Sequence, residues 1–369
     1  MSLRQSTLSI RRALLARPSV AIRHYSKPTV IVAKDPKARA EQLKRLQEEN
    51  PKILAEYEAL RVEVENPSHA HIDESLTFEE PKTWAKNDVG HDTIGPGHGK
   101  HNKRTLSSFS MDGKVCVVTG AARGLGNMMA RTFVESGADA IVIIDLNKAD
   151  AEAAAKDLVD WFETHGQAAP GEIKAQGYGC DVSSEESVKE TFDKIESTYG
   201  RIDALVTAAG IVENFVAHDY PTAKIRKLLD INIMGTWFCA LEAAKRMENG
   251  GTITMIGSMS GSIVNVPQPQ TPYNFSKAAV RHMARSLAVE WAKKNIRVNC
   301  ISPGYTLTNL TKVILDANPV LRDTWVNMVP MGRLADPSDL KGAVIYLSSD
   351  SSKYTTGSEI VIDGGYTCL

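Results

Sequence analysis

VCVVTGAARGLGNMMARTF, residues 115–133, joins a short apolar run to a helical pattern through a loop that holds three glycines. The run VCVVT (115–119) is typical of a buried strand, and Gly120, Gly124 and Gly126 follow in the spacing G-x-x-x-G-x-G. Glycine permits positive φ and close backbone approach, and a helix N-terminus offers free N–H groups to a pyrophosphate. Its position between a strand and a helix makes this otherwise weak pattern indicate a dinucleotide-binding loop.

Six further runs of the same kind follow, separated by longer helical patterns: AIVIID (140–145), AQGYGCDV (175–182), DALVTAAG (203–210), TITMIGS (252–258), IRVNCIS (296–302) and SEIVID (358–363). Apolar strands that alternate with helices are typical of a parallel sheet covered on both faces, with right-handed crossovers. The sequence therefore predicts an α/β fold, a single doubly wound seven-stranded parallel sheet (Rossmann-like) in residues 111–369. Ligands are expected at the carboxyl ends of the strands.

The second run ends in Asp145, where a carboxylate can accept hydrogen bonds from both adenine-ribose hydroxyls and repel the phosphate of NADP. Arg123, inside the glycine loop, could instead pair with that phosphate. We expect NAD, because Asp145 would occupy the 2′ position itself, with NADP as the alternative. Asp145 could also serve only as a helix cap, which is compatible with either cofactor.

TPYNFSKAAV (271–280) places Tyr273 and Lys277 four residues apart, so on a helix both project from one face. A cation beside a phenol lowers its pKa and makes it a candidate proton donor. The pair alone is also compatible with an ordinary surface helix.

Glycine loop, strand-end Asp145 and the Tyr-x-x-x-Lys pair together resemble the short-chain dehydrogenase/reductase family, over roughly residues 112–369. The resemblance implies four catalytic residues: Asn232, Ser258, Tyr273 and Lys277. It implies a cofactor site made of Gly120, Arg123, Gly124, Leu125, Gly126, Asp145, Asp181, Val182, Ala209, Gly210, Tyr273, Lys277, Pro303, Gly304, Thr306 and Thr308.

The resemblance also implies a mechanism in which Tyr273 donates a proton to the carbonyl oxygen while the nicotinamide supplies hydride, or the reverse for an alcohol. Lys277 would lower the tyrosine pKa and bind the nicotinamide ribose, and Ser258 would hydrogen-bond the reacting oxygen. Asn232 would hold a water that links Lys277 to solvent. One position departs from the family pattern, because Thr207 stands where an asparagine usually braces the fourth strand. That change puts local stability in doubt more than catalysis.

The segment from Ser260 to Ala292 is similar to fungal polyol and ketose members of the family, such as arabinitol, sorbose and xylulose reductases. A polyhydroxylated substrate needs hydrogen-bonding groups at the mouth of the site. The candidates are Ser258, Gln268 and Asn214, with Glu213, Asn265 and Gln270 beside them. We therefore expect an NAD(P)-dependent oxidoreductase that interconverts a sugar alcohol, such as arabinitol, and its ketose.

Two alternatives remain. A mitochondrial 3-oxoacyl reductase shares the catalytic set but needs a basic surface for an acidic carrier protein, whereas residues 111–369 hold 25 basic and 30 acidic side chains. A non-catalytic binding or scaffold protein could keep the fold, but it has no need of an intact catalytic set. By family analogy we expect a homotetramer formed through helices near 223–247 and 273–294.

The first 110 residues have a different composition. Residues 1–25 are rich in Arg and Ser, and no acid precedes Asp35, which is typical of a mitochondrial transit peptide cleaved between Tyr25 and Ser26. Residues 26–110 read as a flexible, charged, partly helical leader, and their histidines lack the fixed scaffold that a metal site needs. The sequence predicts a mitochondrial matrix protein with no metal.

Composition limits the partners of the chain. The net charge of −1 gives no basic field for nucleic acid, and no apolar run approaches the roughly 20 residues that span a bilayer. The five cysteines show no C-x-x-C pairing, so we expect free thiols. The expected partners are a small-molecule substrate and other copies of the chain, with no nucleic acid and no integral membrane segment.

Overall fold

The structure, a computed structural model, describes residues 105–166 and 168–369. The predicted transit peptide and the predicted leader up to residue 104 lie outside the described residues. Seven parallel strands form one sheet in the order β3-β2-β1-β4-β5-β6-β7. They are β1 (Val115–Thr119), β2 (Ala140–Asp145), β3 (Lys174–Gly179), β4 (Ala204–Thr207), β5 (Gly251–Ile256), β6 (Ile296–Pro303) and β7 (Glu359–Ile362). The predicted doubly wound parallel sheet is confirmed.

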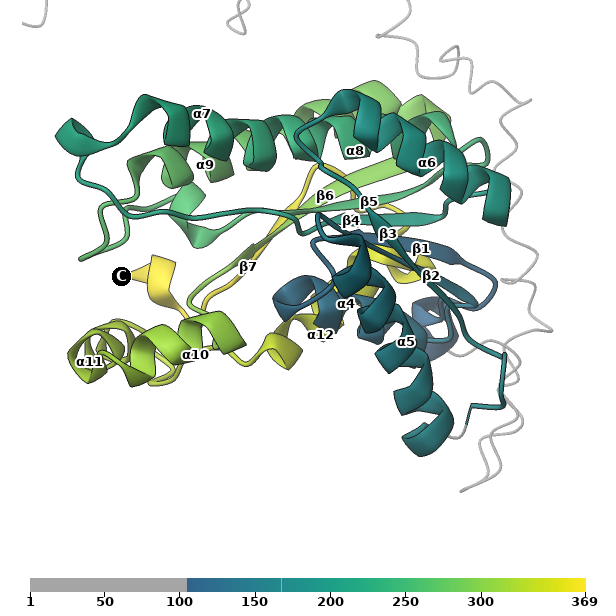
Figure 1. Cartoon of the computed structure of the whole chain (residues 1–369), viewed down its shortest axis with the longest axis horizontal. Helices are drawn as coiled ribbons and strands as arrows, with labels where there is room; N and C mark the ends of the chain where they lie inside the picture. The colour runs from purple at the N-terminus through teal and green to yellow at the C-terminus, as the bar shows by residue number, and fades with distance from the viewer. Residues whose placement is uncertain (1–104, 167) are drawn as a thin grey trace, which may run out of the picture. The chain divides into compact units, whose positions relative to one another are not determined.

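Helices cover both faces of the sheet (Figure 1). The α-helices are α4 (Gly124–Glu135), α5 (Lys148–His165), α6 (Glu185–Tyr199), α7 (Thr222–Leu229), α8 (Gly235–Lys245), α9 (Thr271–Trp291), α10 (Asn309–Asp316), α11 (Pro319–Asn327) and α12 (Lys341–Ser348). One face carries α6, α8 and α9, and the other carries α4, α5 and α12 (Figure 1). Helices α10 and α11 lie beside the C-terminus, away from both layers (Figure 1).

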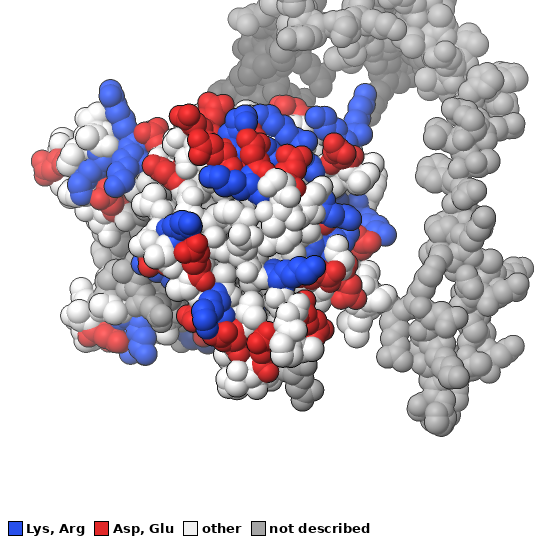
Figure 2. All heavy atoms as spheres, turned by 45° about the vertical axis from the view of Figure 1, so that its right-hand side comes forward, with Lys and Arg blue, Asp and Glu red and all other residues white. Residues whose placement is uncertain are grey.

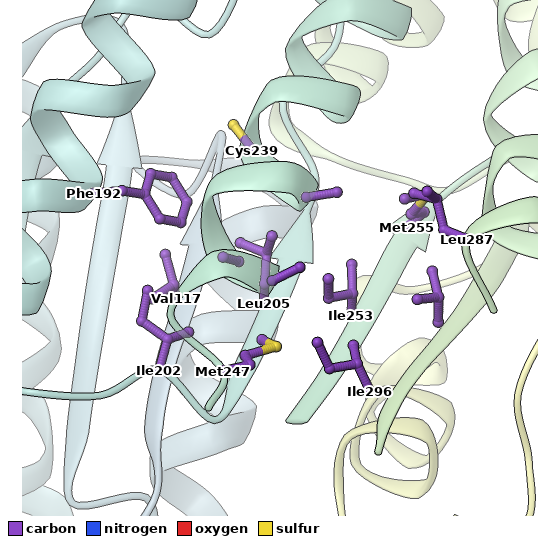
Figure 3. Packing of buried hydrophobic residues seen from close by; sticks show 14 of the residues in the cluster. Val117, Phe192, Ile202, Leu205, Cys239, Met247, Ile253, Met255, Leu287 and Ile296 are labelled. Atoms are coloured by element: carbon purple, nitrogen blue, oxygen red, sulfur yellow. The ribbon is translucent and has the colours of Figure 1, made fainter. Parts of the chain in front are cut away.

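Strand residues are buried because the sheet is covered on both sides. Every residue of β1 and β4 is buried, which explains why these strands read as unbroken apolar runs. On one face, Phe192 of α6, Cys239 of α8 and Leu287 of α9 converge on Leu205 and Ile253 of the central strands (Figure 3). This core holds the helices in place and fixes where their N-termini point.

The predicted strands 175–182 and 203–210 are longer than the observed β3 and β4. Beyond Gly179 and Thr207 the chain leaves the ladder to line the cavities at the end of the sheet. Strands β1 and β4 are neighbours, so the strand order reverses between them. A reversal of this kind opens a crevice at the carboxyl ends of the strands.

Candidate active site

The glycine loop after β1 is packed so closely that side chains are excluded at two positions. A Cβ on Gly120 would lie 2.6 Å from the Cα of Ala209, and one on Gly126 would lie 2.2 Å from the carbonyl oxygen of Gly120. Gly124 has a φ of 62°, and a Cβ there would meet open space. The loop therefore closes against the end of β4 and leaves its outer side open to a ligand.

The N-terminus of α4 is available to an anion. Its N-cap residue is Arg123, and no side chain within residues 105–166 and 168–369 caps it. The first turn, which includes Leu125, carries no acidic residue. Free N–H groups and the helix dipole at such an end favour a pyrophosphate. That this loop binds a pyrophosphate stays a prediction.

A cavity of about 390 Å³ extends from this loop toward the ends of β2 and β3. The predicted residues that line it are Gly120, Arg123, Leu125, Gly126, Asp145, Asp181, Val182, Ala209 and Gly210. The sequence interpretation missed further lining residues, Leu146, Cys180, Ala208, Ile211 and Ile231. Most of these flank predicted positions, so the strand ends alone could have indicated them.

Asp145 is fixed at the end of β2. Its Oδ2 accepts a hydrogen bond of 3.0 Å from the backbone N–H of Ala122, and its Oδ1 accepts one of 2.9 Å from the N–H of Leu146. The carboxylate is thus a cap of the glycine loop as well as a cavity wall. Arg123 is exposed and lines the same cavity, so it is available to the same ligand group.

Asp181 and Val182 have local structural roles besides lining the cavity. Asp181 Oδ1 accepts hydrogen bonds from the N–H of Ser183 at 3.0 Å and from its hydroxyl at 2.6 Å. Val182 is buried, and a Cβ on Gly235 would lie 2.8 Å from its methyl group. These contacts fix the positions of both residues, which suits a cavity wall that contacts the adenine ring of a cofactor.

A second cavity of about 280 Å³ adjoins the first, and both are lined by Leu125, Ala208, Gly210 and Ile211. The predicted Ser258, Tyr273 and Lys277 line it, together with Pro303, Gly304, Thr306 and Thr308 from the end of β6. Thr308 also caps α10, because its hydroxyl accepts from the N–H of Thr311 at 3.3 Å. The structure thus brings three of the four predicted catalytic residues to one cavity.

Tyr273 and Lys277 lie on the first two turns of α9, which begins with Pro272 in its first turn. The Lys277 Nζ lies 5.6 Å from the centre of the Tyr273 ring and donates a hydrogen bond of 2.8 Å to the carbonyl oxygen of Ile256. The lysine is 7% exposed. The ammonium is therefore positioned by the end of β5 and faces the phenol across the cavity wall.

Burial dominates the electrostatics of this pair. It lowers the pKa of Lys277 to about 8. It raises the pKa of Tyr273, and a hydrogen bond from Ser258 acts in the opposite direction. Desolvation of the phenol is the larger effect, and Ser258 is the group that opposes it. The expected effect of Lys277 on the tyrosine pKa stays a prediction.

Ser258 follows β5 in extended backbone conformation and caps η6 (Met259–Gly261). Its Oγ accepts from the N–H of Ser260 at 3.2 Å and donates to the Ser260 hydroxyl at 3.0 Å. The predicted serine is thus fixed at the cavity by its own turn. These bonds favour one orientation of the hydroxyl, which suits a group that orients a reacting oxygen.

Asn232 is fully buried in η5 (Asp230–Met234), a π-helical turn between α7 and α8. Its Oδ1 accepts from the N–H of Ile211 at 2.9 Å, and its Nδ2 donates to the Ile211 carbonyl at 2.9 Å and to Ser276 Oγ at 3.1 Å. These bonds brace the segment after β4, and Oδ1 keeps a second lone pair as an acceptor. That Asn232 holds a water linking Lys277 to solvent stays a prediction.

The predicted substrate contacts divide into two groups. Gln268 lines the second cavity, together with Asn265 and Gln270. Asn214 is exposed and does not line either cavity, and Glu213 forms an ion pair of 2.8 Å with Lys224. The expectation for Asn214 and Glu213 is therefore corrected, because neither residue lines the cavity that holds Ser258, Tyr273 and Lys277.

Aromatic residues at this end of the cavity were missed by the sequence interpretation. Tyr305, after β6, and Trp325, on α11, line the cavity, and their rings stack at 4.1 Å with planes 6° apart. Twenty residues separate them, and no periodicity in the sequence indicates the contact.

A larger cavity, of about 740 Å³, lies at the opposite edge of the sheet, where the strands begin. Its lining includes Lys114, Arg201, Arg297 and Lys353 but none of the predicted site residues. Two of these cations pair with carboxylates in the same lining, Arg201 with Asp203 and Lys353 with Asp350. Its size does not make it the reaction site.

In the part of the chain that the structure describes, every helix is too short or too polar to span a bilayer. The same residues contain no group of three or more His, Cys, Asp or Glu side chains placed to bind a metal ion.

Comparisons with known proteins agree with this geometry. A family model described as enoyl-(acyl carrier protein) reductase matches residues 120–367. D-arabinitol 2-dehydrogenase [ribulose-forming] of Candida tropicalis is 41% identical over 272 residues, covering 71% of this chain and 95% of the relative. The NADH-dependent L-xylulose reductase of Ambrosiozyma monospora is 38% identical over 269 residues, 71% of this chain and 98% of the relative. Among solved structures, a gluconate 5-dehydrogenase of Burkholderia cenocepacia in complex with NADP and tartrate matches with a TM-score of 0.66 and 29% identity, covering 72% of this chain and all of that one.

Proposed function

This chain belongs to the short-chain dehydrogenase/reductase family of oxidoreductases, and from that premise we propose that it interconverts a secondary alcohol of a sugar alcohol, such as arabinitol, and the corresponding ketose. The observation that carries the proposal is the cavity in which Ser258, Tyr273 and Lys277 meet Gln268 and Tyr305. A reacting carbonyl beside the phenol would have polar groups within reach of its neighbouring hydroxyls. The printed names of relatives near 40% identity support the same substrate class.

Three residues of the chain would have different roles in the reaction. A bound nicotinamide cofactor supplies or accepts the hydride. Tyr273 would donate a proton to the carbonyl oxygen, or take it from the alcohol. Ser258, already hydrogen-bonded in its own turn, would orient that oxygen, and Lys277 would bring a positive charge to the same wall.

The glycine loop, the uncapped start of α4 and the cavity beyond them suit a dinucleotide. For the choice between cofactors we favour NAD, because the Asp145 carboxylate is held rigidly by two backbone N–H groups at the cavity. A fixed negative charge disfavours the 2′-phosphate of NADP. Relatives or neighbours are named with either cofactor, so Arg123 keeps NADP as the alternative.

The surface supports the polyol proposal over a carrier-protein substrate. On the face in Figure 2, Lys and Arg alternate with Asp and Glu, without a large basic patch for an acidic carrier. A 3-oxoacyl reductase is the second candidate, because the matching family model is named for acyl-carrier-protein chemistry. A non-catalytic scaffold is the third.

One assay separates these candidates. NADH oxidation is followed by absorbance with a panel of pentuloses and hexuloses and, separately, with a 3-oxoacyl thioester. We expect turnover with at least one ketose and little with the thioester. Turnover of the thioester alone would support the second candidate, and no turnover with any carbonyl would support the scaffold. Repeating the assay with NADPH tests the cofactor choice.

Two further proposals concern the whole chain. Residues 1–25, outside the described residues, support import into the mitochondrial matrix, and the N-terminal sequence of the mature protein should then begin at Ser26. Exposed apolar side chains on and beside α8 and α9, including Met234, Phe275 and Val289, support a homotetramer. Light scattering of the purified protein should give four times the mass of one chain, and a monomeric mass would contradict this.

A further inference from the structure

A series of hydrogen bonds joins the wall that the two cavities share to the backbone of Tyr273. The amide of Asn232 accepts from the N–H of Ile211 at 2.9 Å and donates to the carbonyl oxygen of Ile211 at 2.9 Å. The second hydrogen of Asn232 Nδ2 goes to Ser276 Oγ at 3.1 Å. Ser276 Oγ donates its one hydrogen to the carbonyl oxygen of Tyr273 at 2.8 Å. Each hydrogen in this Ile211–Tyr273 series therefore has its own acceptor.

The two side chains in the middle of the series are buried away from any ligand. Asn232 and Ser276 are both 0% exposed, and neither lines the first or the second cavity. Ile211, at one end, lines both cavities, and Tyr273, at the other, lines the second. A buried polar network whose partners are satisfied holds one arrangement of its members. Ser276 can therefore act on the reaction only through the residues it connects.

The start of α9 has little else of this kind to fix it. Its N-cap residue is Gln270, which makes no side-chain capping bond within the described residues, and Pro272 in the first turn has no N–H to donate. The first turn of a helix leaves backbone groups without partners inside the helix. The bond from Ser276 attaches the Tyr273 backbone to Asn232, a residue of a different element.

Gly210 lies between the series and the ammonium of the catalytic pair. A Cβ on Gly210 would lie 3.3 Å from Asn232 Oδ1 and 3.6 Å from Lys277 Nζ. Asn232 itself sits in the π-helical turn η5, a kind of turn that is frequent at functional sites. Residues 210–211, the Asn232 amide and Lys277 thus form one closely packed unit. A shift of the Tyr273 backbone relative to this unit would change the geometry of the phenol and the cation together.

We propose that Ser276 is a positioning residue for proton transfer, which acts with Asn232 to hold Tyr273 at a fixed distance from the cavity wall at residues 210–211. That wall belongs to the expected cofactor site, so the series keeps the phenol and the cofactor in register. A small misplacement of a reacting group lowers the rate steeply. Loss of the Ser276 hydroxyl therefore slows the reaction without removing a contact to substrate or cofactor. This inference rests on the proposed role of Tyr273 as proton donor.

Ser276→Ala tests the proposal, because it removes only the hydroxyl. With the best substrate of the carbonyl panel, we expect kcat to fall by about tenfold, while KM and the Kd of NADH change by less than about threefold. Thr132→Val is the matched control. Thr132 is 2% exposed, and its hydroxyl likewise donates to a backbone carbonyl, that of Met128 at 2.8 Å, but within α4. Both variants should lower the thermal midpoint, and only Ser276→Ala should lower kcat. Equal kcat values in the two variants would overturn the proposal.

A double-mutant cycle shows whether Ser276 acts through Asn232. In the Asn232→Ala background the series is already broken, so Ser276→Ala should change kcat by less than about twofold. A further tenfold loss in that background would contradict the proposal, because the hydroxyl would then act on its own helix alone.

A second readout needs no substrate, and so it separates failure of this inference from failure of the proposed function. Hydrogen exchange measured by mass spectrometry reports on the N–H of Ile211, which Asn232 holds. Ser276→Ala should speed exchange in a peptide that covers residues 208–212 by at least about threefold, and Thr132→Val should leave it unchanged. Unchanged exchange in Ser276→Ala would count against the series. If the wild type turns over only the acyl thioester, the polyol function has failed, and the same variants assayed with that substrate still test the role of Ser276.

Discussion

The Lys277 ammonium lies 2.8 Å from the carbonyl oxygen of Ile256 and 5.6 Å from the centre of the Tyr273 ring. The end of strand β5 thus fixes the cation, and the phenol lies beside it on the same helix. A buried ammonium held by a neutral carbonyl has no countercharge to offset its desolvation, which is why its pKa falls to about 8. The roles of Tyr273, Lys277 and Ser258 can be tested separately, because they contribute a phenol, an ammonium and an aliphatic hydroxyl.

Replacement of the phenol tests its role as proton donor. Tyr273→Phe removes only the hydroxyl, so we expect turnover to fall by about 10²–10⁴-fold or more while NADH affinity stays within about twofold. Stopped assays measure turnover, and protein fluorescence measures NADH binding. Tyr178→Phe is the control, because that hydroxyl contacts Thr198 of α6 and the residue lines neither cavity. Substantial turnover by Tyr273→Phe would sink the assignment.

The depressed pKa of Lys277 predicts a pH-dependent stability. An unfolded lysine keeps its proton up to about pH 10.5, whereas the folded one loses it near 8. Between these values the unfolded chain binds more protons, so the stability of the wild type relative to Lys277→Met should rise as the pH increases. It should be lowest at pH values below the folded pKa.

Urea unfolding from about pH 7 to about pH 10 measures this difference. Lys293→Met, at an exposed position, should show no such slope. A difference between wild type and Lys277→Met that stays constant, or declines with rising pH, would contradict the burial of a charged group at this site.

The elements that position the site were predictable because they rest on local patterns. The glycine spacing after β1, the strand-end Asp145 and the i, i+4 pair on α9 are properties of short segments, and the sheet order then brings them to one edge. The predicted strands 175–182 and 203–210 were too long. Their last residues leave the ladder and line a cavity, and residue type alone does not distinguish the end of a strand from a cavity wall.

The remainder of the site depends on contacts between distant segments. The stack of Tyr305 on Trp325 requires α11 to return to the segment just after β6, which no short-range pattern indicates. Asn265 and Gln270 have the residue type expected of substrate contacts, but their burial makes them bonds within the wall. Asn232 also has a structural role that the sequence did not indicate, because its amide bonds both backbone groups of Ile211.

Asp145 is expected to control the choice of cofactor. Asp145→Ala removes a fixed negative charge from the cavity wall and should raise the ratio of kcat/KM for NADP(H) over NAD(H) by at least about tenfold. Arg123→Ala should shift the ratio in the opposite direction, because it removes a cation that lines the same cavity. Steady-state kinetics with both cofactors measures the ratio. An unchanged ratio in Asp145→Ala would mean that the carboxylate acts only as a cap of the glycine loop.

Thr207 and Thr119 face each other in register on β4 and β1, and they offer a matched test of the family departure. Both are buried, but only Thr119 Oγ1 has a bond, which it accepts from the N–H of Ala209 at 3.2 Å. Within the described residues Thr207 Oγ1 has no hydrogen-bond partner.

Thr207→Val replaces a buried unpaired hydroxyl with a methyl group of the same shape, so the free energy of unfolding should rise by about 1 kcal/mol. Thr119→Val leaves an N–H without its acceptor and should lower it by about 1–3 kcal/mol. Urea denaturation of the two variants gives both values, and destabilisation by Thr207→Val would show that its hydroxyl does have a partner in solution.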